Sequence, residues 1–135
     1  MEQISWTDDL RTRNSLIDGD HRKLIGRLNL LFEAIEGGQA NDVMSKAMNN
    51  LIVYTKEHFG REEAEMQRIQ YVAFGAHKSE HARLLRDVVE LQGILAAGGK
   101  INVAAVADFL SEWLRNHILT ADMKLAAALK DQKQR

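Results

Sequence analysis

All five histidines of this chain lie at positions that a helical spacing pattern would otherwise fill with apolar residues. They are His21, His58, His77, His81 and His117. If an apolar face covers about three positions in seven, chance places all five there only about one or two times in a hundred. A single such histidine is usually a hydrogen-bonded core residue, but five together predict a shared site. Because the chain has no cysteine, imidazole nitrogen and carboxylate oxygen are the metal ligands it can offer.

Two carboxylates are candidates to join the histidines. Glu62 follows His58 by four residues, which places it about 40° round a helix, whereas Glu63 would lie about 140° away. Asp122 follows His117 by five residues, a spacing that does not fit one face of a regular helix. A wide bundle interior or a π-type bulge would bring Asp122 inward, and otherwise it is an ordinary exposed acid. The spacing alone leaves both alternatives open.

The histidines are also matched in depth along the helices expected to carry them. In each predicted helix, one histidine lies 16 or 17 residues from the helix end that adjoins a glycine-rich turn. The counts run from Gly37 to His21, from Asn41 to His58, from Ala97 to His81 and from Ile101 to His117. At a rise of about 1.5 Å per residue, these four positions agree to within one turn. His77 lies one turn beyond His81 on the same face. The spacing therefore predicts one polar layer across the bundle.

Glycine separates the predicted helices, because the chain of 135 residues contains no proline. The periodicity predicts four helices, over about 16–37, 41–69, 76–97 and 101–130, after an irregular arm at about 1–15 and before a polar tail at 130–135. Asn41 or Asp42, and Asn102, are suited to cap helices. Short connections favour antiparallel neighbours. We therefore expect an all-α, up-down-up-down antiparallel four-helix bundle that forms a single domain over 1–135.

The composition excludes several classes of protein. A net charge of −1 argues against a nucleic-acid binder, which would carry a concentrated basic surface. The segment 1–9 does not read as a signal peptide, and no stretch approaches about 18 consecutive apolar residues. We expect a cytoplasmic protein with no nucleic-acid or membrane partner.

The number of candidate ligands predicts two metal ions. Five imidazoles and two carboxylates are too many for one tetrahedral zinc ion, and they extend over a full helical turn. Iron, zinc, copper and manganese all accept these ligand types. The Glu-x-x-His pairs of ferritin-like di-iron proteins are absent, and Lys78 stands where a zinc protease would carry glutamate between its two histidines.

In combination, these motifs resemble the hemerythrins, specifically those of the single-domain bacterial type. The resemblance rests on His21 within the run 17–24, on His58-x-x-x-Glu62, on His77-x-x-x-His81 and on His117-x-x-x-x-Asp122. It extends from Trp6 to about residue 125 and covers all seven ligand positions, including the five-residue spacing that ends at Asp122. Val72 departs from the pattern, because relatives often have proline there, which affects only the shape of a loop.

The resemblance implies two iron ions with an oxo or hydroxo bridge. His77, His81 and His117 would hold one iron, His21 and His58 would hold the other, and Glu62 and Asp122 would bridge them. Dioxygen would bind reversibly, as hydroperoxide, at the five-coordinate second iron. The apolar pocket around it would include Phe59, Trp113, Leu114 and Ile118, although these four residues also suit an ordinary bundle core.

The expected function is therefore an oxygen carrier, store or sensor rather than an enzyme, because every histidine is assigned to the metal site and none is left as a catalytic base. A di-iron peroxidase or oxidase is one alternative. An iron-handling or iron-sensing protein is another. The expected partners are dioxygen and an unknown protein that receives it, and a monomer is favoured.

Overall fold

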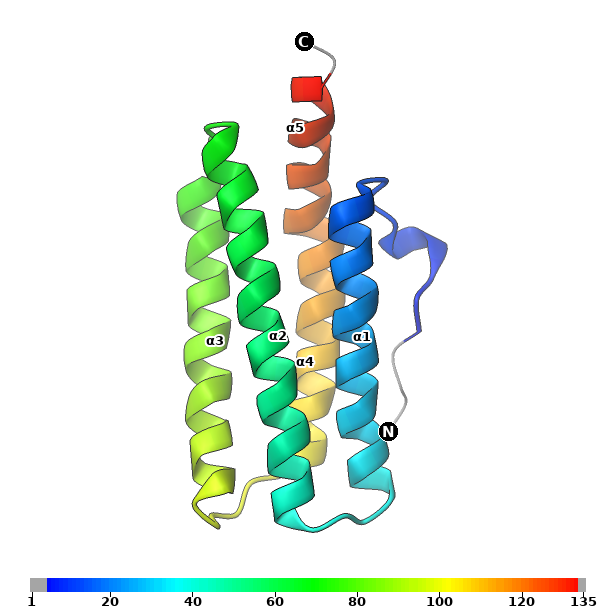
Figure 1. The fold of residues 1–135 in the computed structure, drawn as a ribbon, viewed down its shortest axis with the longest axis vertical. Coiled ribbons are helices and arrows are strands. Elements are labelled where there is room, and N and C mark those ends of the chain that lie inside the picture. Colours follow the sequence, from blue (N-terminus) through cyan, green and yellow to red (C-terminus); the bar gives the residue numbers. More distant parts are fainter. Residues whose placement is uncertain (1–4, 134–135) are drawn as a thin grey trace.

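The computed structural model describes residues 5–133 and has an all-α fold (Figure 1). Four helical columns pack side by side in alternating directions, which confirms the predicted four-helix bundle. The elements are a 3₁₀ turn η1 (Asp8–Leu10), helices α1 (Ser15–Glu36), α2 (Asn41–Arg68), α3 (Phe74–Ala96) and α4 (Val103–His117), a π-helical turn η2 (Ile118–Asp122) and helix α5 (Met123–Lys133).

Asparagine side chains cap the first turns of two helices, Asn14 at the start of α1 and Asn102 at the start of α4. The amide of Ala105 donates to Asn102 Oδ1 at 3.0 Å, so the predicted cap of α4 is confirmed. The prediction that Asn41 or Asp42 caps the second helix is wrong. Asn41 is already the first residue of α2, and Ala40 precedes it in extended backbone without a side-chain cap.

Two glycine-rich turns lie at the same end of the bundle, the lower end in Figure 1. Gly38 follows α1 with a φ of 62°, and Gly98 follows α3 with a φ of 85°. An L-residue with a side chain rarely adopts this left-handed conformation, so glycine ends these helices without strain. Because both turns lie at one level, positions at equal distances from them lie at equal depth in the bundle.

The periodicity predicted one helix over 101–130, but the fourth column is not one regular helix. It consists of α4, the π-helical turn η2 and α5. A π-helical turn accommodates one more residue than an α-helical turn. The side chains after η2 are therefore rotated relative to those of α4.

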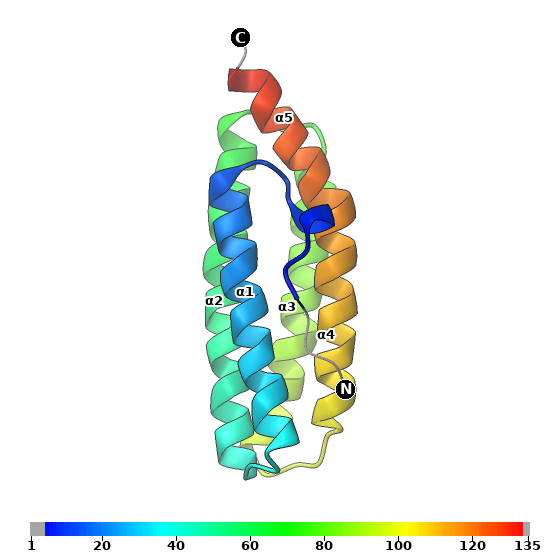
Figure 2. The same ribbon diagram turned by 90° about the vertical axis from the view of Figure 1, so that its right-hand side faces the viewer.

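An arm with little regular structure precedes α1 and crosses the face between α1 and α4 (Figure 2). Leu10 anchors it, since this side chain is fully buried in the core. The guanidinium of Arg22 lies 4.8 Å from the centre of the Trp6 ring, and Arg115 forms an ion pair with Asp9. The predicted arm at 1–15 includes residues 1–4, which lie outside the described residues, as do residues 134–135 of the predicted tail.

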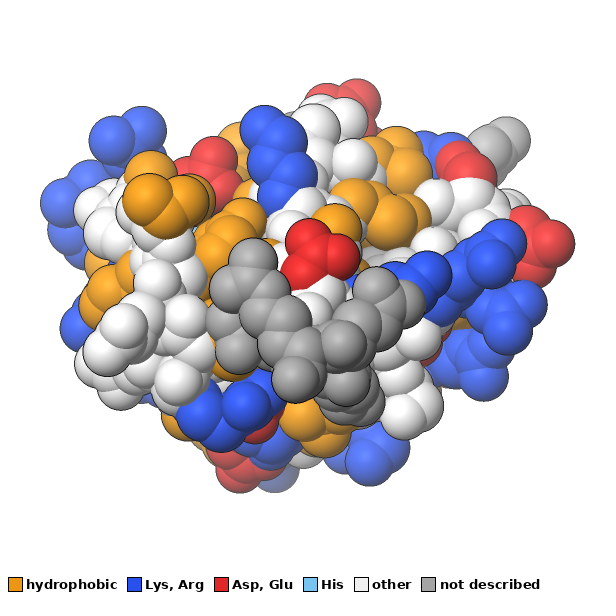
Figure 3. Space-filling model, turned by 90° about the horizontal axis from the view of Figure 1, so that it is seen from above, with side chains coloured by type: hydrophobic (Ala, Val, Ile, Leu, Met, Phe, Trp, Pro, Cys, Tyr) orange, Lys and Arg blue, Asp and Glu red, His pale blue; other side chains and the backbone are white. Residues whose placement is uncertain are grey.

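The core has two apolar clusters with a polar layer between them. The larger cluster fills the half that ends at the glycine-rich turns and includes Leu28, Leu31, Phe32 and Met48. The smaller cluster closes the opposite end and consists of Ile17, Met66, Leu125, Ala126 and Leu129. From that end, apolar side chains are visible among arginine and lysine, and no described histidine reaches the surface (Figure 3). Each helix within residues 5–133 is too short or too polar to span a lipid bilayer.

Candidate metal centre

Seven ionisable side chains form the polar layer, and each is at most 5% exposed. Helix α1 contributes His21, α2 contributes His58 and Glu62, α3 contributes His77 and His81, α4 contributes His117 as its last residue, and η2 contributes Asp122 as its last residue. These are the seven residues that the sequence selected as metal ligands. The structure brings them into two adjoining groups, and the ligand atoms of each group lie within 4.8 Å of one another.

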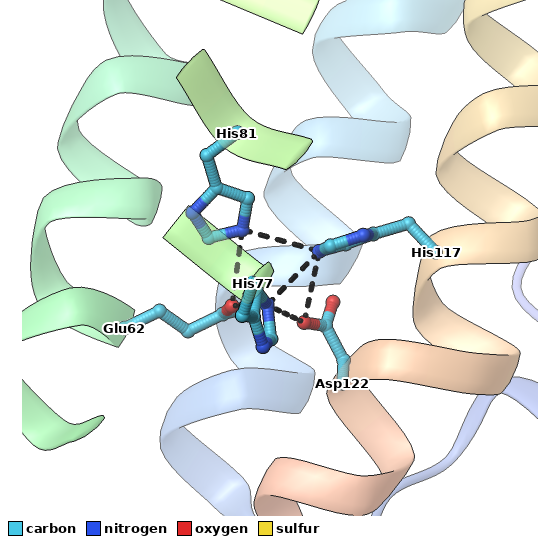
Figure 4. Close-up of side chains that lie close together, drawn as sticks. All are labelled: Glu62, His77, His81, His117 and Asp122. Carbon is cyan, nitrogen blue, oxygen red and sulfur yellow. Dashed lines mark hydrogen bonds and ion pairs between the residues drawn. The ribbon is translucent and has the colours of Figure 1, made fainter. Parts of the chain in front are cut away.

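The first group contains three imidazoles and one oxygen from each carboxylate (Figure 4). His117 Nε2 lies 3.1 Å from both His77 Nε2 and His81 Nε2. Glu62 Oε1 lies 3.0 Å from His77 Nε2 and 3.4 Å from His81 Nε2. Asp122 Oδ1 lies 3.1 Å from His77 Nε2 and 3.2 Å from His117 Nε2. This group offers five donor atoms, three of nitrogen and two of oxygen.

The second group contains two imidazoles and the remaining oxygen of each carboxylate. Glu62 Oε2 lies 2.8 Å from His58 Nε2 and 3.8 Å from His21 Nε2. Asp122 Oδ2 lies 2.8 Å from His21 Nε2. Each carboxylate thus directs one oxygen to each group. The second group offers four donor atoms, one fewer than the first.

The π-helical turn brings Asp122 into the layer. One turn of η2 takes about five residues, so Asp122 lies one turn beyond His117 on the same side of the column. Asp122 is fully buried, and the alternative that it is an ordinary exposed acid is therefore wrong.

Three carboxylates that sequence reasoning missed contact the outer nitrogens of the histidines. Asp20 Oδ2 lies 3.0 Å from His58 Nδ1, Glu63 Oε2 lies 3.1 Å from His81 Nδ1, and Glu80 Oε2 lies 3.2 Å from His117 Nδ1. A carboxylate in this position accepts the Nδ1 proton and leaves the Nε2 lone pair free to bind a metal.

Asp20 is the most strongly held of these three carboxylates. Besides His58, its oxygens accept hydrogen bonds from Arg61 Nε at 2.9 Å, from Arg61 Nη2 at 2.8 Å and from the Tyr54 hydroxyl at 3.2 Å. Burial would raise the pKa of Asp20, but the hydrogen bonds from His58 and Arg61 outweigh it and lower that pKa. Asp20 is therefore ionised at neutral pH.

The electrostatics of the layer favour positive charge. Burial would lower the pKa of His58 and of His77, but nearby carboxylates raise each pKa to about 9. Burial likewise would raise the pKa of Glu62 and of Asp122, but the surrounding imidazoles lower both. The buried carboxylates thus draw either protons or a metal cation to the ring nitrogens.

The donor set fits a pair of metal ions. Among the described residues, no group donates a well-aligned hydrogen bond to any carboxylate oxygen of Glu62 or Asp122, and buried carboxylates without such donors are costly. Two ligand atoms at right angles on one ion, with bonds of about 2.1 Å, lie about 3.0 Å apart, against about 3.4 Å in a tetrahedral site. Of the six separations given above for the first group, five lie at 3.0 to 3.2 Å, close to the right-angled value.

Aromatic rings and an apolar cavity adjoin the layer on the side of the larger cluster. The Phe59 ring stacks on His81 with centroids 3.6 Å apart, and Trp113 stacks on His117 at 4.5 Å. A cavity of about 40 Å³ lies among side chains that include Phe59, Trp113 and Leu114. Three of the four predicted pocket residues therefore line this cavity. The fourth, Ile118, is fully buried but is not part of the lining.

A larger, polar cavity adjoins the opposite side of the layer. It has a volume of about 420 Å³ and lies between α1, α2 and α5. Its lining includes His58 and Glu62 from the second group, together with Asp20 and Arg61. None of the three histidines of the first group lines it.

Comparison with known proteins agrees with this geometry. Residues 12–129 match the hemerythrin HHE cation binding domain. A bacteriohemerythrin of Pseudomonas paraeruginosa is 32% identical over 130 residues, which cover 96% of this chain and 84% of that protein. One from Methylococcus capsulatus is 32% identical over 123 residues, which cover 90% and 93%. A crystal structure of wild-type hemerythrin matches with a TM-score of 0.87 and 31% identity, over 95% of this chain and 98% of that one.

Proposed function

Since this chain belongs to the hemerythrin family, we propose that it binds two iron ions and reversibly binds dioxygen at one of them. The unequal donor sets of the two groups carry this proposal. His77, His81 and His117 would hold one iron, His21 and His58 would hold the other, and Glu62 and Asp122 would join both. The iron with fewer protein ligands would keep a coordination position for dioxygen.

The bound iron pair would supply the electrons that dioxygen takes up on binding and returns on release. Imidazole and carboxylate ligands suit iron in both of its common oxidation states. Asp20, Glu63 and Glu80 would orient three of the imidazoles by accepting their Nδ1 protons.

The apolar cavity supports reversible binding rather than catalysis. Reversible binding requires that water and proton donors stay away from the bound gas. The lining residues of this cavity are all uncharged, and the one hydroxyl among them, that of Thr55, donates to the carbonyl of Leu51 at 2.7 Å. A peroxidase or oxidase would need a general acid or base in this cavity.

The test is to load the purified chain with iron(II) under nitrogen, measure iron per chain, and cycle the absorption spectrum between air and vacuum. We expect two irons per chain and charge-transfer bands that appear in air and disappear on evacuation without added reductant. One metal per chain, or zinc in protein produced with ample iron, would refute the di-iron centre. Bands that disappear only after a reductant is added would refute reversible binding and favour an oxidase.

A pair of variants shows whether the layer holds the iron. Glu62→Gln removes a carboxylate that faces both groups, and we expect it to lose at least one iron per chain. Glu90→Gln makes the same chemical change at an exposed position on α3, and we expect it to retain two irons. Equal iron content in the two variants would argue against the assigned ligands.

A further inference from the structure

The three carboxylates that contact outer histidine nitrogens, Asp20, Glu63 and Glu80, share one arrangement along the bundle, and we call them the outer carboxylates. Each one adjoins a residue of the metal layer in the sequence, and each contacts a histidine on the next helix of the chain. Asp20 on α1 contacts His58 on α2, Glu63 on α2 contacts His81 on α3, and Glu80 on α3 contacts His117 on α4. Successive residues of a helix point about 100° apart, which directs a side chain next to an inward residue toward the neighbouring helix.

Asp20 differs from the other two carboxylates in burial and in the number of its partners. Its side chain is 8% exposed, against 23% for Glu63 and 55% for Glu80. Arg61 donates to both of its oxygens, and Tyr54 donates to one of them. This fork geometry fixes the plane of the carboxylate, which a single point contact would not do.

Within residues 5–133, Asp20 is the one group that contacts an outer histidine nitrogen of the second group, and it contacts His58. His21 is the remaining histidine of that group, and its Nδ1 is buried without a hydrogen-bond partner among the described residues. The polar cavity also reaches His58 and Asp20, so water can compete for their hydrogen bonds. Arg61 lines the same cavity and occupies both oxygens of Asp20.

We propose that Asp20 and Arg61 are positioning residues for the second group, and that through His58 they determine how firmly its iron is held and how easily that iron is oxidised. The inference rests on the proposed function, because it requires iron at both groups. Neither residue belongs to the two groups of ligand atoms. Asp20 acts by orienting His58, and Arg61 acts by holding Asp20 and by balancing its charge.

The two residues have opposite effects on the iron because their charges are opposite. A carboxylate hydrogen-bonded to a ligating imidazole makes that imidazole a stronger donor and favours the ferric state. A guanidinium paired with the carboxylate weakens this effect. Asp20→Asn should therefore shift the ferric/ferrous midpoint potential upward, whereas Arg61→Met should shift it downward.

The first experiment measures iron affinity with iron(II) alone, under nitrogen, against a competing chelator. For Asp20→Asn we expect the more weakly held of the two irons to be bound 10- to 100-fold less tightly, while the tighter iron is unchanged. The comparison variant is Glu80→Gln, whose carboxylate is exposed and can be replaced by water. We expect its effect on either iron to be smaller than that of Asp20→Asn.

The second experiment measures the midpoint potential of each variant after loading with excess iron, with circular dichroism as a check on the fold. If the two residues had a purely structural role, Asp20→Asn would weaken the binding of both irons equally, or Asp20→Asn and Arg61→Met would shift the midpoint potential in the same direction. Either result would overturn the proposal. If Asp20→Asn fails to fold, the downward shift in Arg61→Met still tests it, and an unchanged potential would overturn it. Failure of the unaltered chain to bind two irons would instead refute the proposed function, and this inference with it.

Discussion

Leu114→Ala should destabilise the bundle because it truncates a side chain that is 8% exposed and lines the apolar cavity. The change removes three carbon atoms, at about 0.8 kcal/mol each. The space left behind adds about 24 cal/mol per Å³. The three carbon atoms account for about 2.4 kcal/mol, and a residual void of about 25–65 Å³ brings the loss in the free energy of unfolding to about 3–4 kcal/mol. Chemical denaturation of the two proteins would measure it.

The same change should shorten the lifetime of the oxygen-loaded protein. The cavity of about 40 Å³ has room for water but is lined by apolar groups, and such cavities stay dry. Leu114 lies one turn before His117, so its removal extends the cavity toward the polar layer, where water finds partners. One water that hydrogen-bonds to oxygen leaving the site as the hydroperoxide anion would stabilise that anion by about 1.5–3 kcal/mol, which is about 10- to 150-fold in rate.

The assay follows the loss of the oxygen-loaded spectrum in air, with Leu95→Ala as the matched control. Leu95 is 2% exposed and belongs to the larger apolar cluster, but it does not line the cavity. Leu95→Ala should lower stability to a similar extent and leave the lifetime unchanged. Equal lifetimes in all three proteins would refute the role of the cavity, and equal shortening in both variants would attribute the effect to stability alone.

Three further predictions concern stability. Removing the metal with a chelator should lower the melting temperature by several degrees, measured by calorimetry, because seven buried ionisable groups lose their shared partner. In the metal-free chain, the pKa of His58 and of His77 is about 9 when folded and about 6.5 when unfolded. The stability that these two protonated histidines contribute to the folded chain is complete below pH 6.5 and is lost as the pH rises through 9. The free energy of unfolding should therefore fall over this range. Denaturant titrations should show no such fall in the iron-loaded chain, whose ring nitrogens hold metal instead of protons. Asn102→Ala removes the cap of α4 and should cost about 1 kcal/mol, measured by the same titration.

The sequence predicted the polar layer because two independent patterns agreed. Apolar spacing assigned each histidine to the inner face of a helix, and distance from the glycine-rich turns assigned a common depth. Both patterns depend only on helical geometry, which is why His21, His58, His81 and His117 meet as expected. The cap at Asn41 failed because the choice of first helical residue depends on local backbone geometry that spacing does not determine.

The outer carboxylates were missed because their partners lie on other helices. Whether Asp20 reaches His58 or Arg61 depends on how α1 is rotated against α2, and a single sequence contains no direct record of that rotation. A partial signal was nevertheless present. Asp20, Glu63 and Glu80 each directly precede or follow a predicted metal ligand, and helical geometry directs such residues toward the neighbouring helix.

A signal for the π-helical turn was present in the sequence as well. If α4 continued regularly, the residue seven after His117 would point inward, and that residue is Lys124. In the structure Lys124 is exposed and Leu125 is buried, so the inward face has moved by one residue. The turn thus accommodates one additional residue between His117 and α5, and it keeps Asp122 and Leu125 in the interior.

We therefore expect that the additional residue can be deleted without loss of the fold. Without the exposed Thr120, Asp122 would follow His117 by four residues, the spacing that a regular helix already uses for His58 and Glu62. We expect the deletion to convert η2 into regular helix, to retain two irons and to raise the free energy of unfolding. Deleting the exposed Glu112 in the middle of regular α4 should instead turn buried residues outward and destabilise the chain by several kcal/mol. If the Thr120 deletion destabilised the chain as much as the Glu112 deletion, the π-helical turn would be required for the fold itself and not only for the register of Asp122.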